Sequence, residues 1–488
     1  MSAVAIGIIG LYLLIVLGIG YYGYRTTKRT PQEYFLAGGT LGWVVFPLTM
    51  FATLMSAFIF LGSAGWGYTH GLAWMALLGI EAVAGIPLAL IGLRAWRKAQ
   101  RHDYVTPTGL LGGTFDSDTL KLSVMGIQLA WGVPYVAIQA LGGGLLLETI
   151  SSGSVPFWAG ALAVTLVTAV YLSLGGLRGV AWTDVLQGLT LVVMLVAAGV
   201  YILPRFDPVA LTDQISTQTD LLTTAGAVGL FTPRVWFSFA LMNAMAILAY
   251  PQMFQRFFAA KNERSFRALM LWWPVMVLVA AVVPVLLGVW GTELVPGLSN
   301  PDLVIPALLQ EFAPPVVVGI VLGGAVAAMM STADSLVLTL SSLVAHDLYR
   351  DHLADRVDAD SAELWVSRAT TGLLLLAGYV MALAATGRIP GVPSVGSIID
   401  LAVYFIQGNA LLLPVFLAAL YWPRATATGA IASVAVGQGY FAIAAFDLAP
   451  LPVFGFTPFV PALALAIVAL VGGSLVTTPT TDPAGVEA

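Results

Sequence analysis

Apolar stretches long enough to cross a lipid bilayer recur along the whole of this chain. An α-helix rises about 1.5 Å per residue, so about twenty apolar residues cover a hydrocarbon core of roughly 30 Å. Such stretches predict thirteen transmembrane helices, at residues 3–24, 42–70, 73–96, 119–149, 156–175, 180–203, 228–258, 267–291, 313–346, 366–387, 394–421, 426–446 and 457–477. The connections are too short for a soluble domain, so residues 1–488 are expected to form a single transmembrane domain.

The composition agrees with a membrane protein and excludes several function classes. Hydrophobic residues make up 59% of the chain and charged residues 9%, against roughly 25% charged in soluble domains. The absence of cysteine rules out disulfides, thiol catalysis and cysteine metal sites. The chain also lacks a Ser/His/Asp set, a phosphate-binding loop and a close carboxylate pair, so it is not expected to be an enzyme. No basic run with interleaved aromatic residues indicates nucleic acid as a partner, and no obligate protein partner is evident.

The basic residues predict how the chain lies in the membrane. With the N-terminus outside, the inward-facing connections hold 17 of the 20 Lys and Arg residues, with Arg256 counted among them. Cytoplasmic loops of membrane proteins carry such an excess of Lys and Arg. We therefore expect a multi-pass protein of the cell membrane with an outside N-terminus and a cytoplasmic C-terminus.

Two predicted helices contain residues that interrupt helical geometry. Segment 42–70 has three glycines within six residues, and segment 228–258 contains Pro251, which removes a backbone donor and obstructs the preceding turn. Irregular backbone at membrane depth is tolerated where it lines a cavity or is buried in protein. The two breaks are five helices apart, and a repeated five-helix unit must return inverted, as in many secondary transporters. The alternative is that glycine and proline are simply common in membrane helices.

The segment from Gly323 to Arg350 combines an apolar helix with a polar face. At about 100° per residue, five hydroxyl residues fall within one arc of about 100°; they are Ser331, Thr332, Ser335, Thr339 and Ser342. The carbonyl of Ala328 faces the same way, and Asp334 would add negative potential. Hydroxyl and carbonyl oxygens suit a hard cation. Each hydroxyl alone could instead hold a neighbouring helix or bond its own backbone, but the whole stripe favours a hydrated ion path.

Three acidic residues fall within predicted membrane segments. Glu81 lies in the third predicted helix, Asp184 near the start of the sixth and Asp400 in the eleventh. Ionisable groups are costly in hydrocarbon, which makes each of them a candidate for a functional role. Asp184 either helps to release a cation inward or places negative charge at a helix N-terminus, where the helix dipole favours it.

Four motifs, in consistent order, resemble the sodium:solute symporter family. They are EYFLAGGTLGW (33–43), GGLRGVAWTDVLQG (175–188), YPQMFQRFFAAK (250–261) and STADSLVLTLSSLVAHDLYR (331–350). The resemblance implies an all-α, LeuT-like fold of thirteen transmembrane helices with a five-plus-five inverted-repeat core. The two repeats would span about 42–203 and 228–421, with peripheral helices at 3–24, 426–446 and 457–477. It also implies a secondary active transporter with Na⁺ as the co-transported ion.

Carried over position by position, the resemblance implies a set of binding residues. Sodium would be held by the backbone carbonyls of Ala52, Met55 and Ala328 and by the hydroxyls of Ser331 and Thr332. Asp184 and Ser335 would lie on the ion release path. The solute would lie between the two broken helices, beside Ser56, Phe58, Ile59, Gln139, Tyr250, Gln252 and Tyr404.

The residues around this position limit the expected solute. Phe58 and Ile59 are apolar where sugar-carrying members are polar, and SAFIFLGSAGWGYTHG resembles members that carry small carboxylates, pantothenate or proline. No Arg or Lys is expected at mid-depth to pair with a carboxylate. We therefore expect sodium-coupled import, by alternating access, of a small carboxylate or amino-acid-like solute. The alternatives are a proton-coupled symporter of the same fold, with Asp184 or Asp334 as carrier, and a non-transporting sensor.

Overall fold

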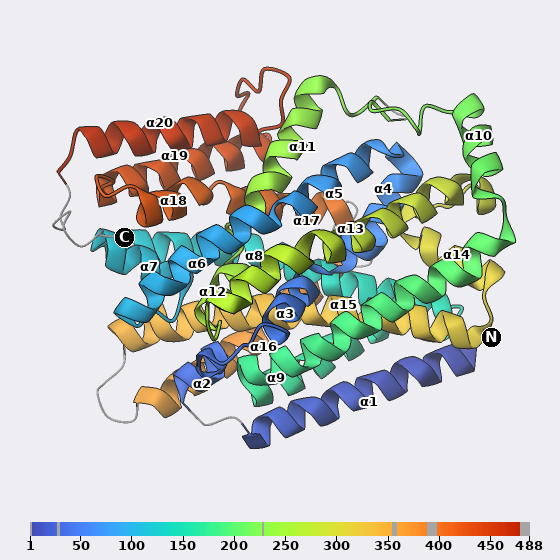
Figure 1. Cartoon of the computed structure of the whole chain (residues 1–488), viewed down its shortest axis with the longest axis horizontal. Coiled ribbons are helices and arrows are strands. Elements are labelled where there is room, and N and C mark those ends of the chain that lie inside the picture. Colours follow the sequence, from blue (N-terminus) through green and yellow to red (C-terminus); the bar gives the residue numbers. More distant parts are fainter. Residues whose placement is uncertain (1, 27–29, 227–228, 354–358, 388–397, 479–488) are drawn as a thin grey trace.

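The computed structural model describes residues 2–26, 30–226, 229–353, 359–387 and 398–478. Within these ranges the chain is helical, apart from one isolated bridge between Leu41 and Ala260, so the expected all-α class is confirmed there. The predicted starts of two segments, at residues 228 and 394, lie outside the described residues. The long helices form one bundle, with α1 (Ser2–Thr26) along one edge and the pair α19 (Ala427–Ala445) and α20 (Phe459–Leu475) along the opposite edge (Figure 1).

The other elements lie between these edges, and several of them begin at polar or proline residues that suit a helix start. Thr106 and Ser117, for example, each accept a backbone N–H that has no partner inside the first turn of the helix that follows. In chain order the elements are α2 (Pro31–Leu36), η1 (Ala37–Gly39), α3 (Val45–Leu54), η2 (Phe58–Gly62), α4 (Ser63–His70), α5 (Ala73–Val83), α6 (Gly85–His102), α7 (Pro107–Phe115), α8 (Asp118–Ile150), α9 (Phe157–Ile202), η3 (Leu203–Arg205), α10 (Pro208–Gln218), α11 (Pro233–Ala246), α12 (Pro251–Phe258), α13 (Glu263–Leu294), η4 (Pro301–Leu303), α14 (Val304–Phe312), α15 (Pro315–Ser342), η5 (Leu343–Arg350), α16 (Ala359–Ala385), α17 (Ile398–Ala410) and α18 (Leu413–Tyr421).

Length and hydropathy give the number of candidate membrane spans. Ten helical segments of the described chain are long and apolar enough, or eleven if the bent pair of α3 with η2 and α4 is one span. Two predicted segments, 156–175 and 180–203, are continuous in α9, but Gly176 within it has φ 55° and ψ −161° and is not helical. Tyr34 packs where a Cβ on Gly176 would lie, so only glycine fits there. The last predicted segment forms α20, a shorter apolar helix of 17 residues, and the count of thirteen stays a prediction.

Both helices that were expected to be interrupted are interrupted. α3 ends at Leu54, and the chain bends by 58° before it continues through the π-helix η2 into α4. α11 ends at Ala246, and α12 begins at Pro251. Because proline lacks a backbone N–H and its fixed φ suits the first turn of a helix, Pro251 starts the second half of its span. Both breaks lie inside the protein, where Met55 and Tyr250 are 1% and 3% exposed.

α15 is the central helix of the bundle. Of the residues in its most apolar stretch, 89% are buried, against 28% in α1. This burial arises because α15 packs against α1, α3, α8, α9, α12 and α16. All five hydroxyl residues of the predicted stripe are buried. Thr339 and Ser342 donate to carbonyls of their own helix, at 2.9 and 2.7 Å. At these two positions the alternative reading, a hydroxyl bonded to its own backbone, is the one found.

The connection between α13 and α15 folds back onto α4. Its short helix η4 approaches so closely that a Cβ on Gly65 would collide with Asp302. Asp302 is buried, and its Oδ2 accepts the Ile398 N–H at 3.4 Å, which ties η4 to the start of α17. Burial raises the pKa of Asp302 from 3.8 to about 6, and the charge of Asp400 adds to the rise. Asp400 itself is exposed at the start of α17.

Replacement of Asp302 by Asn should therefore stabilise the protein at neutral pH but not in acid. Because its pKa is raised from 3.8 to about 6, the stability that Asp302 contributes is present below about pH 4 and lost as the pH rises through about 6. The free energy of unfolding falls by an amount on the order of 2–3 kcal/mol. Asp302→Asn should abolish this fall, because an amide does not ionise, and it keeps an oxygen for the Ile398 N–H. Thermal unfolding in detergent at pH 4.5 and 7.5 checks this, with the exposed Asp220→Asn as control. An equal gain at both pH values would contradict it.

Candidate functional site

The break after α3 places its freed carbonyls against α15. The last carbonyls of a helix have no partner within the helix, and Met55, which follows α3, is extended with ψ 114°. The Thr332 hydroxyl donates to the Met55 carbonyl at 2.7 Å and to the Thr53 carbonyl at 3.1 Å. The structure therefore brings together residues from α3 and α15 that the sequence assigned to one ion site.

The other three residues of the predicted ion site lie around this contact. Ala328 and Met55 line the same small cavity of about 10 Å³, which is the space of a single water molecule. Ala52 is buried in the last turn of α3, with Gly188 of α9 nearby. Ser331 is turned toward α9, where its hydroxyl donates to the Asp184 carboxylate. Five candidate oxygen ligands thus come from the end of α3 and one turn of α15.

An ion pair between α9 and α12 lies next to these oxygens. Asp184 accepts hydrogen bonds from the Thr49 and Ser331 hydroxyls and pairs with Arg256 at 3.2 Å. Both side chains of the pair are buried, with exposures of 0% and 1%. Arg256 was counted from the sequence among the inward-facing basic residues, and its pairing with Asp184 was not predicted. It lies buried within α12, and its place within predicted helix 228–258 is a signal that could have found it.

Arg256 connects α12 to three other helices. Its Nε donates to the Thr49 hydroxyl of α3 at 3.0 Å, and its Nη2 donates to Ser335 of α15 and to Asp184 of α9. Ser335 also lies 3.0 Å from the Thr53 hydroxyl. Arginine suits this position because its planar guanidinium offers five N–H groups in a rigid fork.

A second buried carboxylate, Asp334, completes the charged cluster. It accepts hydrogen bonds from the Tyr171 hydroxyl and, at 3.1 Å, from the Ser335 hydroxyl. Asp184, Asp334 and Arg256, when ionised, carry a net charge of −1, and all three are buried. An uncompensated charge is costly in a dry interior. The cluster is therefore suited to one additional monovalent cation or to a proton.

Most of the predicted solute residues lie at the two helix breaks. Gln139 of α8 accepts the Ala57 N–H at 3.0 Å, and the Ser56 hydroxyl lies 3.2 Å from that of Tyr135. Phe58 is part of η2, and Ile59 lines the small cavity with Met55. Tyr250 and Gln252 lie at the start of α12. Gln139 thus holds the first break in place, and its amide is committed to the backbone.

Two aromatic residues that were not predicted from the sequence, Tyr135 and Phe405, connect the two helix breaks. The Phe405 ring of α17 stacks on Tyr135 at 4.2 Å and packs on Tyr250 at 4.8 Å, measured between ring centroids. Tyr404, which was predicted instead, stacks on Trp131 and Phe446, toward α19. The structure does not bring Tyr404 together with the other predicted solute residues. A one-residue difference on α17 rotates a side chain by about 100°, which sequence position alone did not resolve.

The chain matches the Sodium:solute symporter family over residues 34–437, most of its length. It belongs to this family. Sodium is therefore its co-transported ion, and it is a transporter rather than an enzyme. It is 29% identical over 471 residues to the sodium/pantothenate symporter of Escherichia coli K12, covering 95% of this chain and 94% of that one. It is 27% identical over 449 residues to the sodium/proline symporter of the same strain, covering 88% and 85%.

A solved structure shares the fold of this symporter. A Na⁺-coupled sialic acid symporter, solved in a substrate-bound outward-open state, superposes with a TM-score of 0.80 at 17% identity, covering 98% of each chain. A likeness at this identity shows the fold alone. The multi-pass helical architecture of a membrane transporter is thus established for this chain.

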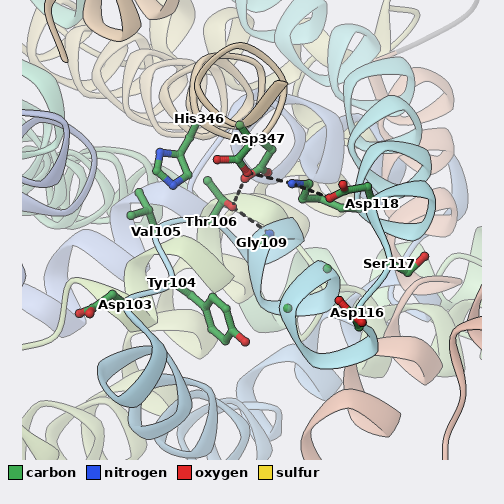
Figure 2. Close-up of a pocket in the computed structure, with 14 residues that line it drawn as sticks. Asp103, Tyr104, Val105, Thr106, Gly109, Asp116, Ser117, Asp118, His346 and Asp347 are labelled. Atoms are coloured by element: carbon green, nitrogen blue, oxygen red, sulfur yellow. Dashed lines mark hydrogen bonds and ion pairs between the residues drawn. The ribbon is translucent and has the colours of Figure 1, made fainter. Parts of the chain in front are cut away.

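The symporter also has a larger cavity, of about 350 Å³, between α7, the start of α8 and η5. Figure 2 shows the side chains that line it, among them Asp347, which lies beside Thr106 and His346. Asp347 accepts hydrogen bonds from Thr106, at 2.7 Å, and from Thr108, while Lys121 bonds to Asp351 at 2.8 Å. These bonds fasten η5 to α7 and α8. The cavity shares no lining residue with the helix breaks, so we do not place the transport site there.

The Asp184–Arg256 pair should behave as a unit when it is mutated. Removal of one partner leaves an unpaired buried charge, which costs about 3–5 kcal/mol, so Arg256→Gln alone should lower thermal stability strongly. The double variant Asp184→Asn with Arg256→Gln should recover much of that loss. Thermal unfolding of the singles and the double gives the coupling. The exposed Arg97–Glu263 pair, at 2.7 Å, is the control and should couple by less than about 1 kcal/mol. Additive losses at Asp184 and Arg256 would contradict the account.

Proposed function

We propose that this symporter imports a small carboxylate-bearing or amino-acid-like solute together with sodium, by alternating access. The observation that carries the proposal is the 2.7 Å contact between the Thr332 hydroxyl and the Met55 carbonyl, because it joins a broken helix to the central helix at a cluster of oxygens. Family membership supports sodium as the ion. The pantothenate and proline symporters among its relatives support a small carboxylate as the solute class.

In this proposal sodium takes the place of the hydrogen bonds at the α3 break. The carbonyls of Ala52, Met55 and Ala328 and the hydroxyls of Ser331 and Thr332 serve as its ligands, since hard cations take oxygen. Rotation of the Thr332 hydroxyl proton frees its oxygen lone pair for the ion. Ser335 lies one turn further along α15, and Asp184 lies beside it on α9. These two residues provide the release path for the ion.

The solute is proposed to bind between the two breaks, beside Ser56, Phe58, Ile59, Tyr250 and Gln252. Gln139 positions the first break for it. Arg256 is the only buried Arg of the described chain, and four of its five N–H groups donate to Asp184, Thr49, Ser335 and the Gln252 carbonyl. A solute carboxylate is therefore proposed to rely mainly on helix ends, hydroxyls and the sodium ion.

The proposal places this transporter in the cell membrane with thirteen spans, an outside N-terminus and a cytoplasmic C-terminus. The non-helical Gly176 divides α9 into two lengths, 157–175 and 177–202, that each suffice for one span. The breaks in α3–α4 and α11–α12 support a five-plus-five inverted repeat over about 42–203 and 228–421, with α1, α19 and α20 at the periphery. The burial of Arg256 removes one residue from the inner basic count and leaves the bias in place.

Thr332→Ala and Ser331→Ala should each raise the sodium concentration that gives half-maximal uptake. Each removes one oxygen from a five-oxygen site, and an interaction with a charged group is worth about 1.5–3 kcal/mol, or about ten- to a hundredfold. The measurement is uptake of labelled pantothenate, proline and short monocarboxylates by proteoliposomes under an imposed sodium gradient. Ser341→Ala is the matched control, because this buried hydroxyl of α15 faces Ser367 of α16. Sodium dependence unchanged in both variants would reject the site.

Proton coupling is a second candidate because a proton on Asp184 or Asp334 would also neutralise the net charge of −1. Vesicles with a pH gradient and no sodium separate the two couplings. Uptake that follows the pH gradient alone would show that protons rather than sodium are the coupling ion at this site. Measurable binding without any solute flux would instead indicate a sensor.

A further inference from the structure

Several buried polar side chains around the two breaks have atoms without a hydrogen-bond partner among the described residues. They are Nε1 of Trp74, Oε2 of Glu81, both amide atoms of Asn243 and Oε1 of Gln252. The exposures of these four residues are between 0% and 4%. Buried polar groups in proteins are nearly always hydrogen-bonded, so each exception calls for an explanation such as a ligand. Trp74, Glu81 and Asn243 were not among the solute residues expected from the sequence.

Trp74 and Glu81 lie on α5 and Asn243 lies on α11, two helices that pack against each other, whereas Gln252 lies on α12. The Trp74 ring contacts Phe58 of η2 at 5.8 Å and Phe239 of α11 at 6.1 Å. Asn243 lies one helical turn after Phe239, on the same face of α11. Trp74 and Asn243 therefore both lie between α5 and α11, and Trp74 also contacts η2 through Phe58.

Glu81 adds a carboxyl group to this set. It lies two turns after Trp74 on the same face of α5, and it is buried. Trp273 of α13 bonds only to the backbone carbonyl of Glu81, at 2.9 Å. The Oε2 atom of Glu81 therefore has no hydrogen-bond donor among the described residues.

A carboxyl group in such surroundings selects its ligand by hydrogen bonding. Its oxygens accept hydrogen bonds, so an N–H or O–H donor of the solute would be bound there. A site built to hydrogen-bond a donor also discriminates strongly against an analogue that lacks it, because the buried group is then left unpaired. The aromatic rings of Phe58, Trp74 and Phe239 offer an apolar wall beside it.

We propose that Glu81, flanked by Asn243 and Trp74, is a specificity-determining subsite that binds an N–H or O–H group of the solute, at the end opposite its carboxylate. This inference rests on the proposed function and narrows the solute class to carboxylates that also carry a hydrogen-bond donor. The donor is either a neutral hydroxyl or amide, or an ammonium group. An ammonium group needs the negative charge of Glu81, whereas a neutral hydroxyl or amide needs only an oxygen of its side chain.

The test compares solutes that differ only in the donor. One pair is proline and cyclopentanecarboxylate, in which the ring N–H is replaced by a methylene. The other is pantothenate and its analogue with both hydroxyls replaced by hydrogen. Calorimetric binding to the purified full-length protein at saturating sodium should favour the donor-bearing member of at least one pair by about tenfold or more. Glu81→Leu should reduce that preference to less than about threefold.

Two further variants separate recognition from folding. Thr371→Val is the matched control, because Thr371 is also fully buried with an unpartnered hydroxyl but lies on α16, which packs against α8, α9 and α15. It should keep the wild-type preference. Glu81→Leu should raise thermal stability while it weakens binding, because it removes an unpaired buried group; a structural role would lower stability instead. Glu81→Gln should keep the preference for a neutral donor and lose it for an ammonium group.

The inference is overturned if wild-type protein shows no preference in either pair, or if Glu81→Leu keeps the full preference. Failure of the proposed sodium coupling gives a different result. In that case binding of the donor-bearing solute would be equal in sodium and in choline, while the preference and its dependence on Glu81 would remain.

Discussion

A break in a membrane helix leaves backbone N–H and C=O groups where water cannot reach them, so other parts of the protein must form hydrogen bonds with them. In this symporter the break after α3 is held by two neighbours. Thr332 of α15 donates to the Met55 carbonyl, and Gln139 of α8 accepts the Ala57 N–H, two residues further along. One interruption of the backbone therefore fixes two positions. Carbonyl oxygens at the end of α3 lie against α15, where the ion is proposed to bind, and Phe58 of η2 contacts Trp74 of α5.

The electrostatics of the ion side follow from a single guanidinium. Arg256 neutralises Asp184 from within the protein and connects α12 to α3, α9 and α15. Asp334 is left with hydroxyl donors only, from Tyr171 and Ser335. In the proposed function, a sodium ion bound beside Thr332 would complete the charge balance without displacing the arginine. The same connections make Arg256 sensitive to any relative movement of these four helices, which is where alternating access has to act.

The helical fold, the two helix breaks and the polar face of α15 could be predicted from sequence because they depend on patterns that the chain displays locally. Apolar length predicted the spans, Pro251 predicted the second break, and the spacing of Ser331 and Thr332 predicted the face of α15. Arg256 was misplaced because it lies close to a predicted helix end and its partner, Asp184, is 72 residues away. Phe405 was missed in favour of Tyr404 because sequence does not fix the rotation of α17. Trp74 and Asn243 gave no signal, since their importance lies in bonds that they do not make.

The two sides of the proposed transport site differ in how completely their polar groups are satisfied. On the ion side, Ser331, Thr332, Ser335, Asp184 and Arg256 all have hydrogen-bond partners within the protein. On the solute side, Trp74, Glu81, Asn243 and Gln252 have polar atoms without partners among the described residues. A sodium ion is small and can enter a preformed network by turning a few hydroxyl groups. An organic solute brings its own donors and acceptors, so the groups that recognise it have to be held ready at some cost in stability. Incomplete hydrogen bonding at the solute side is therefore what selectivity requires of a buried site.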